Sequence, residues 1–219
     1  MMKLTKRFAV CMLAALLVLC VLTACGGSTL PTKWQNSKTM ADLTKRGIGA
    51  DNVSLTARFT VNGESEETYV SYAARGSKEY VTYYDWGEDG RPTPLLLICK
   101  YGSTYYAGAY VQEGGTEIQW EKGSSIEIEE FEYAKKLCKI PARTEKASDY
   151  VCKQTELNGQ TVYAEQVTLD GMTYTYGLDQ KDTLLGLQTQ IHDETYTVEF
   201  TELKNGPAEG AFPVPDVKN

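Results

Sequence analysis

The feature that most constrains the fold is a long series of short runs in which apolar and polar side chains alternate. The run 53–61 shows it most clearly, with these residues on one face: Val53, Leu55, Ala57, Phe59 and Val61. A period of two predicts a half-buried β-strand. Runs rich in Tyr, Val, Thr and Leu continue to Trp120, separated by these turn signals: Asn62-Gly63, Gly76-Ser77, Gly87 to Pro94, Gly102 and Gly114-Gly115. We expect six strands in a meander.

Residues 124–140 replace this pattern with a helical one. Ser124 and Glu127 match a capping box, and Pro141 stops the helix. The apolar stripe of this helix consists of Ile128, Phe131, Ala134, Leu137 and Cys138. A strand through residues 126–128 is the competing interpretation, and the cap favours the helix.

A second meander follows the predicted helix. Hairpin signals stand at Asn158-Gly159 and Asp170-Gly171, and looser turns lie near 180–182 and 192–193, which predicts about five more strands. Ahead of the first meander, residues 37–46 predict a short helix that Ser37 caps and Gly47 ends.

The N-terminal residues 1–24 have the pattern of a signal peptide. Lys3, Lys6 and Arg7 precede an apolar run from Phe8 to Val21, which would rise only ~21 Å as a helix and is too short to span a bilayer. The residues at the end of the run, Leu22, Thr23, Ala24 and Cys25, resemble the lipobox of bacterial lipoproteins. That resemblance implies cleavage before Cys25 and a diacylglycerol on its sulfur, which would hold the protein on the extracytoplasmic face of the cell membrane.

The charge of the remaining chain restricts its partners. The 22 basic residues, less the three before the apolar run, leave 19 against 29 acidic ones, a net charge of −10. We expect no nucleic-acid partner, because phosphate binding needs a basic face. We therefore expect a tether at residues 25–32, one domain at residues 33–219, and localisation through the lipid alone.

The order of the predicted elements indicates the fold class. Two antiparallel meanders with two helices form an α+β layout, in which helices must cover one face of a large curved sheet of about 11 strands. This order, the lipobox and the C-terminal Ala211 to Asp216 (AFPVPD) resemble the LolA/LolB-type lipoprotein carriers and the lipid-carrying lipoproteins of mycobacteria. The resemblance implies an unclosed half-barrel whose concave, apolar side is covered by helices and accepts acyl chains.

The ligand of such a half-barrel would lie between helix and sheet. We predict that the following apolar and aromatic residues contact a lipid or other apolar ligand there: Tyr83, Trp86, Leu97, Phe131, Ala134, Tyr174 and Leu187. The alternative is a structural or protein-interaction module whose closed core binds no small molecule. An unfilled apolar cavity between helix and sheet would distinguish the two.

Catalytic and metal-binding patterns are lacking in the sequence, so we expect neither an enzyme nor a cofactor. His192 is the only histidine and falls in a predicted turn, and no serine has the context of a common acyl-transfer motif. The spacing of Cys99, Cys138 and Cys152 fits no usual zinc pattern. In an extracytoplasmic compartment, Cys138 and Cys152 are close enough in sequence to predict a disulfide, and Cys99 is expected to be a buried thiol.

Overall fold

A computed structural model describes residues 39–64, 68–86, 91–111, 115–142, 146–157 and 159–217. Every described residue belongs to one compact unit, Trp34–Asn219. The predicted signal peptide, Cys25 and the tether at 25–32 lie outside the described residues. In the described part of the chain, no helix combines the length and apolar character needed to cross a membrane.

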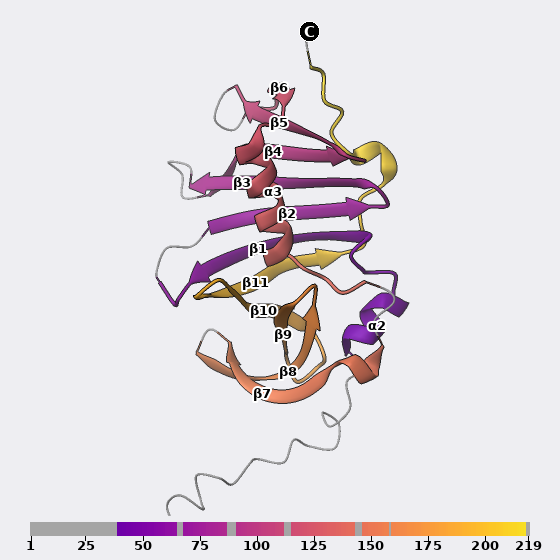
Figure 1. The fold of residues 1–219 in the computed structure, drawn as a ribbon, viewed down its shortest axis with the longest axis vertical. Helices are drawn as coiled ribbons and strands as arrows, with labels where there is room; N and C mark the ends of the chain where they lie inside the picture. Colours follow the sequence, from indigo (N-terminus) through magenta and orange to yellow (C-terminus); the bar gives the residue numbers. More distant parts are fainter. Residues whose placement is uncertain are drawn as a thin grey trace, which may run out of the picture. The chain divides into compact units, whose positions relative to one another are not determined.

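Eleven antiparallel strands form one sheet in the order β6-β5-β4-β3-β2-β1-β11-β10-β9-β8-β7 (Figure 1). The strands are β1 Asn52–Val61, β2 Thr68–Arg75, β3 Lys78–Trp86, β4 Pro92–Tyr101, β5 Thr104–Tyr110, β6 Ile118–Lys122, β7 Val151–Leu157, β8 Gln160–Leu169, β9 Met172–Leu178, β10 Leu184–Ile191 and β11 Glu194–Lys204. Both predicted meanders are present, and the pairing of β1 with β11 joins them into one sheet. The sheet does not close, because β6 and β7 are its two edges. The predicted half-barrel class is confirmed.

The hairpins form where the sequence predicted them. Asn62 and Gly63 have φ values of 51° and 75°, and Asp170 and Gly171 have 53° and 79°. Two consecutive positive φ angles produce the tight turn whose twist matches that of the flanking strands. The Asp170-Gly171 turn joins β8 directly to β9, whereas Asn62-Gly63 turns the chain at the end of β1, ahead of a longer connection to β2.

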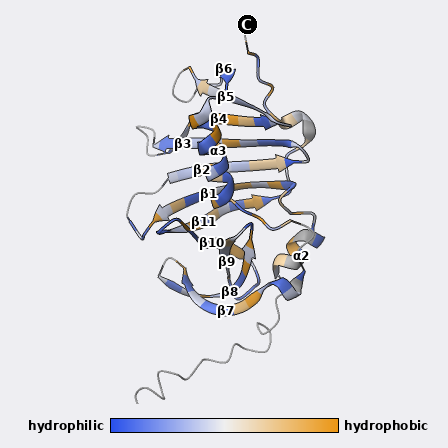
Figure 2. Cartoon of the chain, in the orientation of Figure 1, coloured by the Kyte–Doolittle hydropathy of each residue, from blue (hydrophilic) through white to orange (hydrophobic). Residues whose placement is uncertain are grey.

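The helix α3, Ser125–Leu137, begins at the predicted capping box. The backbone N–H of Ser124 donates to Glu127 Oε2 at 2.8 Å, which fixes the first turn. The competing strand interpretation of this segment is therefore wrong. Most residues of α3 are hydrophilic (Figure 2), and its narrow buried stripe of Phe131, Ala134 and Leu137 packs toward β2 and β3.

The helix α2 is described over Thr39–Lys45, within the predicted range, and the predicted cap Ser37 lies outside the described residues. Its first two described amides, those of Thr39 and Met40, donate to the two carboxylate oxygens of Glu165 in β8, each at 3.0 Å. Glu165 is only 2% exposed, and a carboxylate at a helix N-terminus is stabilised by the free amides and the helix dipole. The short 3₁₀ turns η2, Ala147–Asp149, and η3, Glu209–Ala211, complete the elements.

Alternation along the strands separates the sheet into two faces. We call the face that α3 covers the helix face; one row across it joins Leu55, Tyr72, Val81, Ile98 and Ala107, all buried. The opposite face, the outer face, carries the row Thr56, Ser71, Thr82, Leu97 and Gly108. The core therefore lies between α3 and the helix face.

Candidate binding surfaces

The predicted ligand space between α3 and the sheet is filled by side chains. Phe131, Ala134 and Leu187 have 0% exposed surface, so no void that admits a water molecule touches them. The ring of Phe131 meets that of Tyr105 in β5 edge-on, with 5.4 Å between the ring centroids. The helix stripe and the sheet thus pack directly against each other.

The other predicted ligand residues are spread over different surroundings. Tyr83 lies on the helix face and donates its hydroxyl to the carbonyl of Glu130 at 2.9 Å, while Tyr174 is buried and stacks on Tyr176. Trp86 is 49% exposed at the end of β3. Leu97 is buried on the outer face, in the row that contains Thr82. The seven residues therefore do not form a single site.

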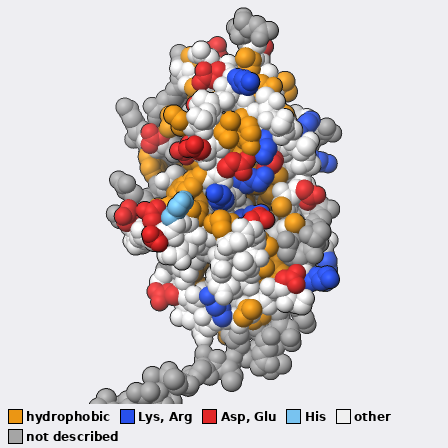
Figure 3. Space-filling model, viewed as in Figure 1, with side chains coloured by type: hydrophobic (Ala, Val, Ile, Leu, Met, Phe, Trp, Pro, Cys, Tyr) orange, Lys and Arg blue, Asp and Glu red, His pale blue; other side chains and the backbone are white. Residues whose placement is uncertain are grey.

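A hollow of about 530 Å³ opens on the helix side, between α3 and the β10–β11 hairpin. We call it the helix-side hollow; its lining residues are Glu129, Glu130, Glu132, Tyr133, Lys136, Ile191, His192, Glu194 and Tyr196. Figure 3 shows the single histidine of the chain beside hydrophobic and acidic side chains on this surface. His192 has a φ of 55° in the predicted turn, and the structure places this turn at the rim of the hollow.

Packed aromatic rings form one wall of the helix-side hollow. The rings of Tyr133 and Tyr196 meet edge-on with centroids 5.7 Å apart, and Phe59 of β1 lies 6.4 Å from each. The Tyr196 hydroxyl donates to Glu194 Oε2 at 2.6 Å. Burial, reinforced by the hydrogen bond with Tyr196, raises the pKa of Tyr133 far above its usual value.

The charge of the helix-side hollow is negative. Four glutamates line it against one lysine, Lys136, and the histidine. Glu132 is engaged by Lys100 at 3.2 Å and by the Tyr105 hydroxyl at 2.6 Å, and these contacts together lower the pKa of Glu132 although burial opposes them. Within the described residues, the carboxylates of Glu129 and Glu130 have no ion-pair partner. This hollow thus joins an apolar aromatic wall to a rim on which acidic side chains outnumber basic ones.

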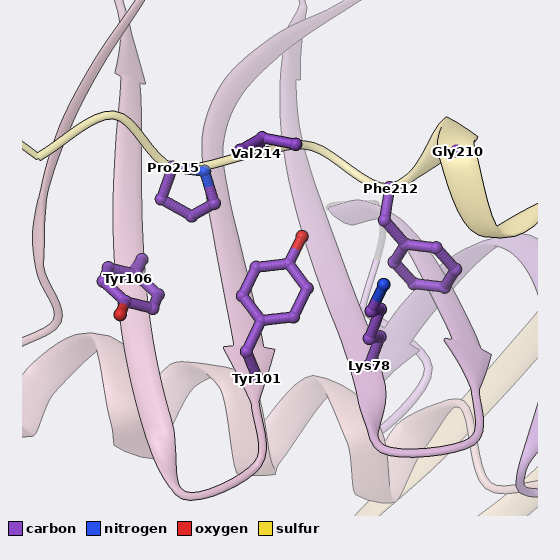
Figure 4. Close-up of a pocket in the computed structure, with 7 residues that line it drawn as sticks. All are labelled: Lys78, Tyr101, Tyr106, Gly210, Phe212, Val214 and Pro215. Atoms are coloured by element: carbon purple, nitrogen blue, oxygen red, sulfur yellow. The ribbon is translucent and has the colours of Figure 1, made fainter.

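A second pocket, of about 480 Å³, lies where the C-terminal segment crosses the strands (Figure 4). Lys78, Tyr101 and Tyr106 form one side, and Gly210, Phe212, Val214 and Pro215 form the other. The Tyr101 hydroxyl donates to the Pro213 carbonyl, which holds the segment in place, and burial raises the pKa of Tyr101 to about 12. The C-terminal AFPVPD stretch therefore packs on the sheet as an integral part of the fold.

The predicted disulfide is not formed in the structure. Cys138 and Cys152 are both free thiols, as is Cys99. Cys138 is fully buried at the end of α3 near Tyr72 and Tyr83, whereas Cys152 lies in β7 opposite Glu165. Proximity in sequence misled the prediction, because the chain between the two cysteines leads from the α3 layer to the far edge of the sheet.

Alkylation in the folded protein is expected to reach Cys152 well before Cys99 or Cys138. Burial raises the pKa of Cys99 to about 12 and that of Cys138 still further, so at pH 8 almost none of either thiol is the reactive thiolate. Iodoacetamide labelling followed by non-reducing peptide mass mapping measures the order in which the three thiols react. In denaturant all three thiols should react alike; a linked Cys138–Cys152 peptide, or equally fast labelling of Cys99 in the folded state, would contradict the structure.

The described ranges contain no group of three or more His, Cys, Asp or Glu side chains able to hold a metal ion.

The sequence did not predict the helix-side hollow. Its residues come from α3 and the β10–β11 hairpin, which are about sixty residues apart in the chain. Only the run of glutamates at 127–132 signalled it, and such a run is also the ordinary solvated side of a helix.

A scan against protein-family models finds no match for the chain, and a search of curated proteins finds none either. Among solved structures, the chain is similar to PNGF-II, at 12% identity and a TM-score of 0.32, over 72% of this chain and 28% of that one. It thus spans less than a third of PNGF-II.

Three further solved structures are of bacterial proteins. An outer membrane lipoprotein-sorting protein domain from Vibrio parahaemolyticus matches at 12% identity and a TM-score of 0.29, over 78% of this chain and 94% of that one. MucB matches at 17% identity and a TM-score of 0.28, over 81% of this chain and 63% of that one, and the MucA/MucB complex of Pseudomonas aeruginosa is also similar. At these TM-scores the similarities assign neither a family nor a function to this chain.

Proposed function

We propose that the chain is a lipoprotein, anchored through Cys25 on the extracytoplasmic face of the membrane, that works as a protein-interaction module. Its helix-side hollow takes a cationic, amphiphilic segment of a partner protein. The lipid holds the domain at the membrane surface, and the hollow supplies the binding.

The observation that supports this function is the combination of wall and rim in the helix-side hollow. Tyr133, Ile191 and Tyr196 offer apolar contact area, and tyrosines are effective at interfaces because a large ring carries a polar tip. Glu129 and Glu130 add negative charge, and neither carboxylate forms an ion pair with a described residue. Charge of one sign beside an apolar surface steers a partner of the opposite charge toward it and excludes like-charged competitors.

The packed interior favours this function over an acyl-chain carrier. An acyl chain between α3 and the sheet would have to displace side chains such as Phe131 and Leu187, which have no exposed surface. A carrier also has to admit the lipid headgroup at the mouth of its cavity. The glutamate rim of the helix-side hollow repels the anionic headgroups common in bacterial membranes.

A basic amphipathic probe tests this function. A fluorescent peptide of alternating Lys and Leu is expected to bind residues 34–219, the unit that holds every described element, and binding should weaken as salt is added. A peptide of alternating Glu and Leu should not bind. Fluorescence anisotropy measures the binding of both peptides. The double change Glu129→Lys/Glu130→Lys should lower the affinity for the Lys/Leu peptide by roughly tenfold or more.

The matched control is Glu117→Lys/Glu121→Lys, which makes the same change in net charge at exposed residues beside and within β6. It should leave most of the affinity intact. Equal losses in both double variants would mean that only the overall charge matters, and the proposed site would be wrong. If organic extraction of the purified full chain recovered non-covalent lipid in stoichiometric amount, the lipid-carrier function would instead be the better hypothesis.

A further inference from the structure

A third hollow, of about 360 Å³, lies on the outer face of the sheet and is lined mainly by hydroxyl groups. We call it the outer hollow, and the residues that matter to it are Ser71, Tyr80, Thr82, Tyr84, Leu97 and Tyr110. They come from four neighbouring strands, β2 to β5, so the rigid ladder of the sheet sets their spacing. The hollow lies on the opposite face from the helix-side hollow and is independent of it.

Some of the hydroxyl groups that line the outer hollow are hydrogen-bonded to one another, and others are not. Thr56 Oγ1 and Ser71 Oγ lie 3.0 Å apart, as do Ser71 Oγ and the Tyr84 hydroxyl, forming a chain across β1, β2 and β3. In the described part of the protein, the hydroxyls of Tyr80, Thr82 and Tyr110 have no hydrogen-bond partner, although Thr82 is only 6% exposed. A nearly buried hydroxyl without a partner costs free energy that a hydrogen-bonding ligand can recover.

Tyrosine rings give the outer hollow apolar surface as well. Tyr80 and Tyr84 of β3 and Tyr110 of β5 stand around the buried side chain of Leu97 on the strand between them. Phe212 of the C-terminal segment packs edge-on against Tyr80 with centroids 5.5 Å apart, and Pro213 forms a wall. These contacts hold the site in shape before any ligand arrives.

The outer hollow is electrically neutral. Its only charged lining residues are Glu202 and Lys204, which pair with each other at 2.9 Å. A phosphate or other anion finds no unpaired cation there, and an acyl chain would leave the open hydroxyls buried without partners. The fitting ligand is neutral, carries many hydroxyls that both donate and accept, and has an apolar face for the tyrosine rings.

We propose that the outer hollow binds a saccharide. A pyranose ring presents C–H groups on its faces, which suit Tyr80, Tyr84 and Tyr110, and hydroxyls around its edge, which suit the open groups of Thr82 and the tyrosines. A pocket of this size takes a small ligand or a short part of a longer glycan chain. On an extracytoplasmic surface, the source of such a glycan is a polysaccharide of the cell envelope.

Saturation-transfer NMR on the full chain, in a detergent without a sugar headgroup, tests the proposal. The probes are the trisaccharide of N-acetylglucosamine, cellotriose and maltotriose, each up to about 10 mM, which detects millimolar affinity. At least one is expected to receive saturation from the protein. Tyr80→Phe and Tyr110→Phe keep the rings and should each weaken that binding roughly fivefold, which corresponds to one net hydrogen bond.

The matched control is Tyr106→Phe, which removes a hydroxyl from β5 on the same face but outside the outer hollow. It should leave saccharide binding unchanged. Because the hydroxyls of Tyr80 and Tyr110 have no protein partner, their removal should also leave the thermal midpoint unchanged, which separates a binding role from a structural one. Failure of all three trisaccharides to bind, or equal weakening by Tyr106→Phe, would overturn the proposal and leave the helix-side function untouched.

Discussion

Replacing Ala134 by Trp is expected to destabilise the domain by about 3 kcal/mol or more, enough to unfold a marginally stable protein. Ala134 has no exposed surface and lies between Phe131 and Leu137 on the buried stripe of α3. An indole has no room there, so it must push the helix from the sheet or force neighbouring side chains out of their preferred rotamers. Urea denaturation of residues 34–219, followed by circular dichroism, measures the loss.

The control is Ile126→Trp, a substitution in the first turn of the same helix at a side chain that is 68% exposed. Its effect should stay within about 0.5 kcal/mol of zero, as for ordinary surface changes. The opposite result at position 134, full stability with the indole in place, would reveal expandable space between α3 and the sheet. An acyl-chain ligand would then again be the better hypothesis.

Changing Cys25 to Ala is expected to abolish lipid attachment and to leave an uncleaved precursor. In the proposed lipoprotein, the thiol of Cys25 would accept the diacylglycerol, and lipoprotein signal peptidase would cleave the chain only after that step. The wild type should partition into a detergent phase and have the intact mass of the lipidated form. The variant should keep residues 1–24 and gain no lipid mass.

A matched control is Cys20→Ala, which removes a thiol from the apolar run ahead of the lipobox. This variant should be lipidated and cleaved like the wild type. A mature, cleaved and soluble product from Cys25→Ala would show that an ordinary signal peptidase processes the chain. The proposed anchor would then be wrong, whereas the proposals for the helix-side hollow and the outer hollow would be unaffected.

Short-range sequence patterns were sufficient to predict the helices, strands and turns. The alternation over residues 53–61, the paired turn residues such as Asn62-Gly63 and the capping box of Ser124 with Glu127 all predicted structure that is present. Each of these depends on side chains within a few residues of one another, so the sequence reports them directly. The resemblance of element order and C-terminal stretch also led to the correct class, an unclosed antiparallel half-barrel.

Local rules could not predict which side chains become neighbours when they lie far apart in the sequence. The carboxylate that caps α2 belongs to Glu165, 126 residues away from the amide of Thr39. Ser37 was the natural local candidate, and nothing in the sequence near Glu165 indicates its partner. The Cys138–Cys152 disulfide failed for the same reason, since a short separation along the chain does not determine which layer each thiol enters.

By itself, the sequence determined the strands, the two helices and the turns between them, because these depend on local periodicity and short motifs. Lipid attachment at Cys25 is likewise predicted from a short motif. The tertiary structure alone decided that β1 pairs with β11, that α3 fills the space once assigned to a ligand, and that Leu97 faces away from α3. It also brought the glutamates of α3 to the β10–β11 hairpin and laid the C-terminal segment across the outer face. Both hollows depend on these long-range pairings, because each is lined by residues that are neighbours only after the sheet has formed.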